Sequence, residues 1–106
     1  MARASAVLIL NDATTGYPLA CIEASLISAT RTAASAALAA ERISPDPFGG
    51  TLGVIGTGVI ARTTVEWLLF RNWQFRKISL YDVDRKEAEH FSKWLRDRCD
   101  LRADIQ

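Results

Sequence analysis

The residues best suited to chemistry in this sequence surround two glycines, Gly56 and Gly58, which follow the apolar residues 52–55. In a dinucleotide-binding turn, the first glycine allows a sharp bend and the second lets a pyrophosphate approach the backbone. A small third residue, here Ala61, keeps the following helix close to the sheet, and the free N–H groups of that helix face the phosphates. The pattern alone is a weak signal. The candidate cofactor contacts are Gly56, Thr57, Gly58, Val59, Ile60 and Ala61.

An acidic residue, Asp82, closes the strand expected after this turn, at residues 77–82. Such a carboxylate accepts hydrogen bonds from ribose hydroxyls and repels a 2′-phosphate, which favours NAD over NADP. Asp82 lies slightly beyond the usual spacing of about 20 residues, and a long return loop absorbs the difference. Alternatively, Asp82 starts the next helix, but Asp84 already fills that role. Arg85 keeps NADP open as the less favoured cofactor, because a basic residue there accommodates the 2′-phosphate.

The composition restricts the classes of protein that remain. The chain has 106 residues, 49% of them hydrophobic, and a formal net charge of +1, which fits one small globular domain. The near-neutral charge gives no reason to expect nucleic acid or an anionic membrane as a partner. No apolar run approaches the roughly 20 residues that span a bilayer. The short run at residues 6–10 is interpreted as a core strand rather than a signal peptide.

Neither a metal site nor a catalytic base is apparent. Cys21 and Cys99 stand alone, without the spacing of a metal site, and are interpreted as reduced thiols of a cytoplasmic protein. His90, the single histidine, falls on the polar side of the last expected helix, where a solvated surface residue is the simpler interpretation. We therefore assign no metal ligand and no catalytic residue.

The elements that must position these residues follow from turn residues and periodicity. Two apolar runs, residues 6–10 and 17–23, flank a glycine-containing turn and predict a β-hairpin. The alanine-rich residues 25–42 predict a helix, and the Pro/Gly-rich residues 44–50 predict a linker. A strand at 52–55, a helix at 58–71, the strand at 77–82 and a helix capped by Asp84 follow. The predicted fold is α/β, a partial Rossmann fold (βαβα) preceded by a β-hairpin and an alanine-rich helix.

Motifs along most of the chain together resemble the ornithine cyclodeaminase/mu-crystallin family. They are Thr15-Gly-Tyr-Pro-Leu19, Thr30-Arg-Thr-Ala-Ala34, Ile55-Gly-Thr-Gly58 and Tyr81-Asp-Val-Asp84. Arg-Thr-Ala-Ala on an alanine-rich helix before the glycine turn is more specific than the glycines. The resemblance implies that residues 1–43 are a piece of a substrate and dimerisation domain. It also implies that residues 44–50 are a linker and residues 51–106 the N-terminal part of an NAD-binding Rossmann domain.

The resemblance also implies a substrate site. In the family, the arginine of the second motif binds the carboxylate of an amino-acid substrate, and the matching residue here is Arg31. A guanidinium suits this role because it donates paired hydrogen bonds to a carboxylate. Thr32 is the preferred neighbouring contact to cofactor phosphate or substrate, with Thr30 as a second candidate. Alternatively, these hydroxyls bond preceding helix carbonyls, and Arg31 forms an ordinary surface ion pair.

The activity implied by the resemblance is NAD-dependent oxidation at the amine-bearing carbon of an amino acid, through an imine. The substrate would be similar to ornithine or to N-(2-amino-2-carboxyethyl)-glutamate. Ile60, where many cyclodeaminases have glutamine, modestly favours the branch that makes 2,3-diaminopropionate for siderophores. The family's enzymes are much longer, and the lysine, second arginine and aspartate that they use cannot be assigned here. The chain is therefore interpreted as a fragment that is inactive alone.

The sequence is also compatible with other functions. The resemblance to mu-crystallin allows a non-catalytic NAD(P)H-binding protein, and an inactive structural remnant is a further alternative. An unrelated imine reductase, such as a pyrroline-carboxylate reductase, is disfavoured because the glycine turn of those enzymes usually lies near the N-terminus. An incomplete Rossmann sheet exposes strand edges that invite pairing, so we expect a homodimer or another form of self-association.

Overall fold

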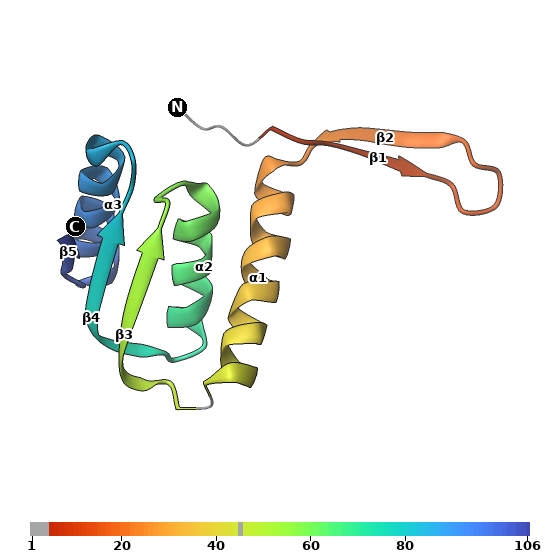
Figure 1. The fold of residues 1–106 in the computed structure, drawn as a ribbon. Helices are drawn as coiled ribbons and strands as arrows, with labels where there is room; N and C mark the ends of the chain where they lie inside the picture. Colours follow the sequence, from red (N-terminus) through yellow and green to blue (C-terminus); the bar gives the residue numbers. More distant parts are fainter. Residues whose placement is uncertain (1–4, 45) are drawn as a thin grey trace.

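The computed structural model describes residues 5–44 and 46–106. In chain order they form β1 (Val7–Asn11), β2 (Pro18–Glu23), α1 (Ser25–Ile43), β3 (Phe48–Ile55), α2 (Val59–Phe70), β4 (Gln74–Tyr81), α3 (Arg85–Cys99) and β5 (Ala103–Ile105). A hairpin and a long helix therefore precede a β-α-β-α-β unit (Figure 1). This order confirms the α/β class and the arrangement expected from the sequence. None of the helices within the described residues has the length and apolar character needed to cross a membrane.

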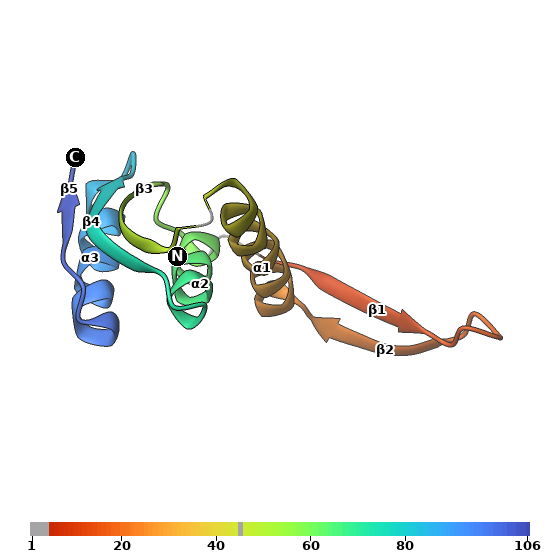
Figure 2. The same ribbon diagram turned by 90° about the horizontal axis from the view of Figure 1, so that it is seen from below.

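The β1–β2 hairpin extends away from the rest of the molecule (Figures 1 and 2). Its strands are antiparallel, as the two apolar runs predicted. Asp12 shapes the turn, because its carboxylate accepts hydrogen bonds from the N–H groups of Thr14 and Thr15 and from the Thr15 hydroxyl. The same bonds, with the Thr15 N–H first, lower the pKa of Asp12. One ionised side chain therefore reinforces the backbone hydrogen bonds between Asp12 and residues Gly16 and Tyr17 that close the turn.

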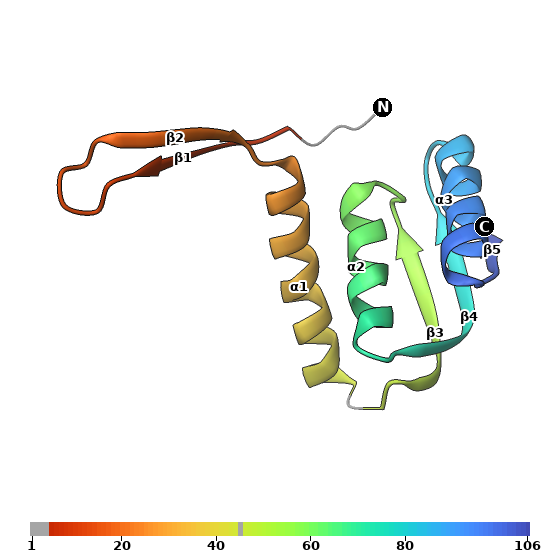
Figure 3. The same ribbon diagram turned by 180° about the vertical axis from the view of Figure 1, so that it is seen from behind.

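The second sheet is parallel throughout, in the order β3-β4-β5. Helices α2 and α3 form the two crossovers that parallel neighbours require. Ile78 and Leu80 of β4 point to one face, where they form the buried core with Val65 of α2 and with Phe91 and Leu95 of α3. Both helices therefore cover the same face of the sheet (Figure 3).

The middle of the opposite face of the sheet carries small and polar side chains, and the exposed Ile55 and Tyr81 lie where β3 and β4 end. Gly53 lies beside Ser79, and Ser79 lies beside Asp104. Lys77 Nζ and Asp104 Oδ2 are 3.2 Å apart and form an exposed ion pair across the two strands. Because parallel sheets are usually covered by helices on both faces, the described residues correspond to one side of a layered α/β fold.

Helix α1 packs along α2 through its alanines. Ala29, Ala33 and Ala37 recur at a spacing of one helical turn and are buried. The two helices lie side by side (Figures 1 and 3). Glu41 and Arg71 form an ion pair between them, in which Arg71 Nη2 donates to Glu41 Oε2 at 2.8 Å. The small alanine side chains therefore let the two helices approach each other closely.

Two strands begin earlier than the sequence indicated. β3 starts at Phe48, inside the segment expected to be a linker, and β4 starts at Gln74 rather than at Lys77. Phe48 pairs with Gln74, whose N–H also donates to the carbonyl oxygen of Pro47 at 2.8 Å. Pairing extends beyond the apolar runs because backbone hydrogen bonds between strands do not depend on apolar side chains.

Candidate functional site

The glycine turn joins the carboxyl end of β3 to the N-terminus of α2. Gly56 has a φ of +82°, a left-handed conformation that strains any residue with a Cβ. Its N–H donates to the carbonyl oxygen of Tyr81 at 2.8 Å, which ties the turn to the end of β4. The backbone conformation itself therefore favours glycine at position 56.

Gly58 differs, because the described chain does not require glycine there. It is the N-cap of α2 with φ −74° and ψ −173°, values that residues with a side chain also adopt. A Cβ at this position would have no heavy atom within 4 Å. Ala61 packs against the core below. The space in front of the Gly58 backbone is therefore open to a ligand.

The N-terminus of α2 offers backbone donors beside this space. The helix begins at Val59, and the Arg62 N–H donates to the carbonyl oxygen of Gly58 at 3.1 Å. The N–H groups of Val59, Ile60 and Ala61 precede that bond, and no side chain of the described residues caps them. Such groups, together with the helix dipole, favour an anionic ligand.

Asp82 follows the end of β4 and is hydrogen-bonded to the turn. Its Oδ2 accepts both the N–H and the hydroxyl of Thr57, each at 2.7 Å, and its Oδ1 accepts the N–H of Asp84 at 3.0 Å. These bonds, with the Thr57 hydroxyl first, lower the pKa of Asp82 to about 2. A negative charge therefore stands beside the glycine turn at neutral pH.

Arg31 and Thr32 lie apart from this group, on the exposed side of α1. The N-termini of α1 and α2 and the carboxyl ends of β3 and β4 are at the same end of the molecule (Figure 1). Both residues occupy the N-terminal half of α1 and therefore lie toward the end that carries the turn. Within the described residues, the fold brings Thr57 and Asp82 into contact but does not join Arg31 to them by a hydrogen bond.

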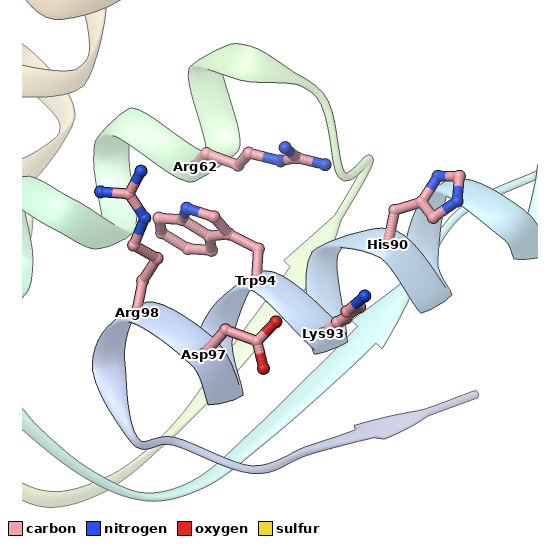
Figure 4. Close-up of a pocket in the computed structure, with 6 residues that line it drawn as sticks. All are labelled: Arg62, His90, Lys93, Trp94, Asp97 and Arg98. Carbon is pink, nitrogen blue, oxygen red and sulfur yellow. The ribbon is translucent and has the colours of Figure 1, made fainter.

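Two open hollows lie along the helices, and the glycine turn lines neither of them. One, of about 380 Å³, lies between α2 and α3 (Figure 4) and is lined by Arg62, His90, Lys93, Trp94, Asp97 and Arg98. The other, of about 300 Å³, lies between α1 and α2 and is lined by Thr30, Thr63, Glu66, Trp67 and Phe70.

Of the residues that line the first hollow, the sequence analysis considered His90 but not Arg62. Its guanidinium lies 5.7 Å from the centre of the Phe91 ring, so it helps to join α2 to α3. The feature of the sequence that could have identified Arg62 is its position directly after the glycine motif. His90 lies at an exposed position on the edge of the same hollow, where it is solvated as the sequence indicated.

The cysteines show no arrangement for chemistry. The part of the chain that the structure describes contains no group of three or more His, Cys, Asp or Glu side chains placed to hold a metal ion. Cys21 is exposed on the hairpin, and Cys99 is partly buried at the end of α3. Burial, and then the charge of Glu66, raises the pKa of the Cys99 thiol. A raised pKa disfavours the thiolate, which is the nucleophilic form.

Comparison with known proteins agrees with the resemblance seen in the sequence. The model of the ornithine cyclodeaminase/mu-crystallin family matches residues 1–105. N-((2S)-2-amino-2-carboxyethyl)-L-glutamate dehydrogenase of Staphylococcus aureus is 36% identical over 102 residues, which are 95% of this chain and 30% of that protein.

Solved structures with the same fold are similarly longer. Delta(1)-pyrroline-2-carboxylate reductase of Thermococcus litoralis, in complex with NADH and L-proline, has a TM-score of 0.81 at 30% identity and covers 96% of this chain. An archaeal alanine dehydrogenase dimer with bound NAD has a TM-score of 0.78 at 32% identity and also covers 96%. In both cases the match spans 31% of the longer chain. The expectation that a pyrroline-carboxylate reductase would be unrelated was therefore wrong for the pyrroline-2-carboxylate enzyme.

Proposed function

The chain belongs to the ornithine cyclodeaminase/mu-crystallin family, and we propose that it forms the dinucleotide-binding part of an NAD-dependent amino-acid oxidoreductase or cyclodeaminase. The observation that carries the proposal is Gly58. Neither its φ nor its surroundings require glycine, so the absence of a side chain serves the close approach of a pyrophosphate. The N–H groups of Val59, Ile60 and Ala61 would bind the phosphates. Asp82 would accept the ribose hydroxyls.

The preferred cofactor is NAD rather than NADP. The archaeal alanine dehydrogenase holds NAD, and the T. litoralis reductase holds NADH. In this chain, the ionised Asp82 would repel a 2′-phosphate. Arg85 is the nearby cation that could attract a 2′-phosphate. Its Nε atom lies 3.4 Å from Oε1 of Glu89 on the same helix, α3, and the two side chains form an ion pair.

The substrate would be a small amino acid held by its carboxylate. Arg31 would bind this group through paired hydrogen bonds, with Thr32 beside it. When bound, the cofactor would take a hydride from the amine-bearing carbon, and water or an internal amine would attack the resulting imine. The S. aureus relative favours a substrate like N-(2-amino-2-carboxyethyl)-glutamate over one like ornithine. Residues 1–43 would then contribute to the substrate side and residues 51–106 to the cofactor side.

A second candidate is a non-catalytic NAD(P)H-binding protein similar to mu-crystallin. It is favoured by the same open turn, which would hold a nucleotide whether or not a reaction follows. No catalytic residue is assigned among the described residues, so we expect these residues alone to bind a nucleotide without turnover. Measurable oxidation of an amino acid by these 106 residues would contradict that expectation and favour the enzyme. We place the protein in the cytoplasm because Cys21 and Cys99 have no disulfide partner.

The first test is calorimetric titration of the chain with NAD, NADH and NADP. We expect NAD or NADH to bind more tightly than NADP, and Asp82→Ala to reduce that difference. Gly58→Ala should weaken NADH binding by about tenfold or more, which corresponds to about 1.4 kcal/mol. Gly53→Ala is the matched control, because a Cβ there also has no heavy atom within 4 Å but lies on the strand. A folded chain that binds no nucleotide, or a Gly58→Ala variant that binds as wild type does, would contradict the proposal.

A further inference from the structure

Thr57 stands out among the turn residues because it is a buried polar residue. It is 1% exposed, although it lies between two exposed glycines at the surface end of the sheet. Its hydroxyl and its N–H both point at one oxygen, Oδ2 of Asp82, at 2.7 Å each. Because the hydroxyl is buried, a water molecule cannot take its place as the hydrogen-bond donor to Asp82. A buried polar group keeps such a bond because losing it would cost more than an exposed bond would.

The two bonds from Thr57 determine how Asp82 can be used. A carboxylate oxygen accepts about two hydrogen bonds, so Oδ2 is saturated by Thr57. Oδ1 accepts the N–H of Asp84 at 3.0 Å, and the N–H of Val83 is the weakest of the groups that stabilise the ionised carboxylate. The lone pairs of Oδ1 are therefore less fully used than those of Oδ2. The carboxylate is therefore held in one orientation, with a single oxygen available to a ligand.

We propose that Thr57 is the positioning residue that holds Asp82 and thereby sets the preference for a dinucleotide without a 2′-phosphate. This inference rests on the proposed function of the turn. With both oxygens held, the carboxylate cannot turn away from a 2′-phosphate, and its negative charge stays at the end of β4. Oδ1 would accept a ribose hydroxyl in addition to the N–H of Asp84. The N–H of Thr57 is occupied by Asp82, so phosphate binding falls to the N–H groups of Val59, Ile60 and Ala61.

The experiment compares Thr57→Val with Thr57→Ser in the full chain. Valine has nearly the shape of threonine but no hydroxyl, whereas serine keeps the hydroxyl. For each variant, calorimetry gives the Kd of NADPH divided by the Kd of NADH. We expect this ratio to exceed one in the wild type, to fall about tenfold in Thr57→Val and to stay within about twofold in Thr57→Ser. A merely structural role would weaken both nucleotides together and leave the ratio unchanged.

A second readout is the titration of the Asp82 carboxyl carbon by NMR. Thr57→Val should move the pKa of Asp82 from about 2 toward its ordinary value of 3.8, and Thr57→Ser should restore it. If circular dichroism shows that Thr57→Val does not fold, Thr57→Ala removes the hydroxyl with a smaller side chain in its place.

The outcomes separate the two proposals. The wild-type chain could bind NADH while Thr57→Val leaves the ratio of the NADPH and NADH Kd values unchanged. That result overturns the role of Thr57 and leaves the proposed function standing. A folded wild-type chain that binds neither nucleotide overturns both. A lowered ratio in Thr57→Val that is rescued in Thr57→Ser supports both.

Discussion

At the scale of single residues, the carboxylate of Asp82 links the stability of the chain to pH. Its pKa is about 2 in the folded chain against an ordinary value of 3.8, so folding favours the ionised form. The resulting stabilisation is complete above pH 3.8 and is lost as the pH falls through 2. For Asp82→Asn, we therefore expect the free energy of unfolding to change less than in the wild type between about pH 4 and about pH 2. Urea denaturation at a series of pH values measures this difference.

Asp97→Asn provides the control for this experiment, since it removes an exposed carboxylate from α3 rather than from the turn. Asp12, Glu23 and Glu41 also have lowered pKa values in the fold, from bonds to Thr15, Ser25 and Arg71 respectively. Their contributions are common to all the proteins compared, so the difference between wild type and variant isolates Asp82. Equal pH slopes for wild type and Asp82→Asn would show that Asp82 does not link stability to pH.

The two glycines of the turn should respond differently to alanine. At Gly56, with φ +82°, a Cβ strains the backbone, and we expect Gly56→Ala to lower the free energy of unfolding by about 1–2 kcal/mol. At Gly58, with φ −74° and open space around it, alanine should cost less than about 1 kcal/mol, mainly as a poorer N-cap. Urea denaturation compares the two directly. A loss at Gly58 as large as at Gly56 would mean that the fold itself requires the second glycine.

At the scale of elements, the sequence predicted best where local signals act alone. The last helix is an example: Asp84 was expected to cap it, and it accepts the N–H of Lys86 as the N-cap. Ala88, Phe91 and Leu95, at helical spacing, face the core. The early starts of β3 and β4 were not predicted, because Phe48 and Gln74 lie outside the apolar runs. Their strand conformation depends on pairing between segments that are distant in sequence.

In the candidate site too, residues with local signals could be predicted, and contacts between distant segments could not. The glycine motif and Asp82 were recognisable because each residue type has a role at a known spacing. The bonds from Thr57 to Asp82 span 25 positions of sequence and become visible only when β3 and β4 are paired. Threonine is common in turns, so nothing in its type or spacing distinguishes a buried donor from a solvated hydroxyl.

The C-terminus of α3 allows a prediction about helix ending. Asp100 adopts a left-handed conformation with φ of 52°, and the N–H of Leu101 donates to the carbonyl oxygen of Leu95 at 3.2 Å. Glycine adopts this conformation without strain. We expect Asp100→Gly to raise the free energy of unfolding by about 0.5–1 kcal/mol. Asp97→Gly, inside the same helix, should lower it by about 0.5–1 kcal/mol. Urea denaturation tests both, and a loss of stability in Asp100→Gly would contradict the assigned helix end.

At the scale of the whole molecule, the hairpin carries an apolar surface that no other described element covers. Val7, Ile9 and Leu19 are 70%, 64% and 64% exposed. The register places Ile9 opposite Cys21, and since alternate residues share a face, Val7 and Ile9 lie on the same face of the hairpin. Leu19 lies farther along β2, where the register shifts. An isolated two-stranded hairpin is at best marginally stable in water. Covering this face with apolar surface from a second copy would stabilise the hairpin.

We therefore expect the chain to self-associate through the hairpin. The solved alanine dehydrogenase that shares this fold is a dimer, although only 31% of its chain is matched here. Sedimentation velocity over a range of concentrations should show wild-type chain that forms dimers or larger species and dissociates on dilution. Val7→Lys with Ile9→Lys should sediment as a monomer, because burying two charges on that face is unfavourable. Thr14→Lys, at the exposed turn of the hairpin, adds charge outside the face and should associate as wild type does. A wild-type chain that remains a monomer throughout would contradict self-association, and association that persists in the double variant would exclude the hairpin as its surface.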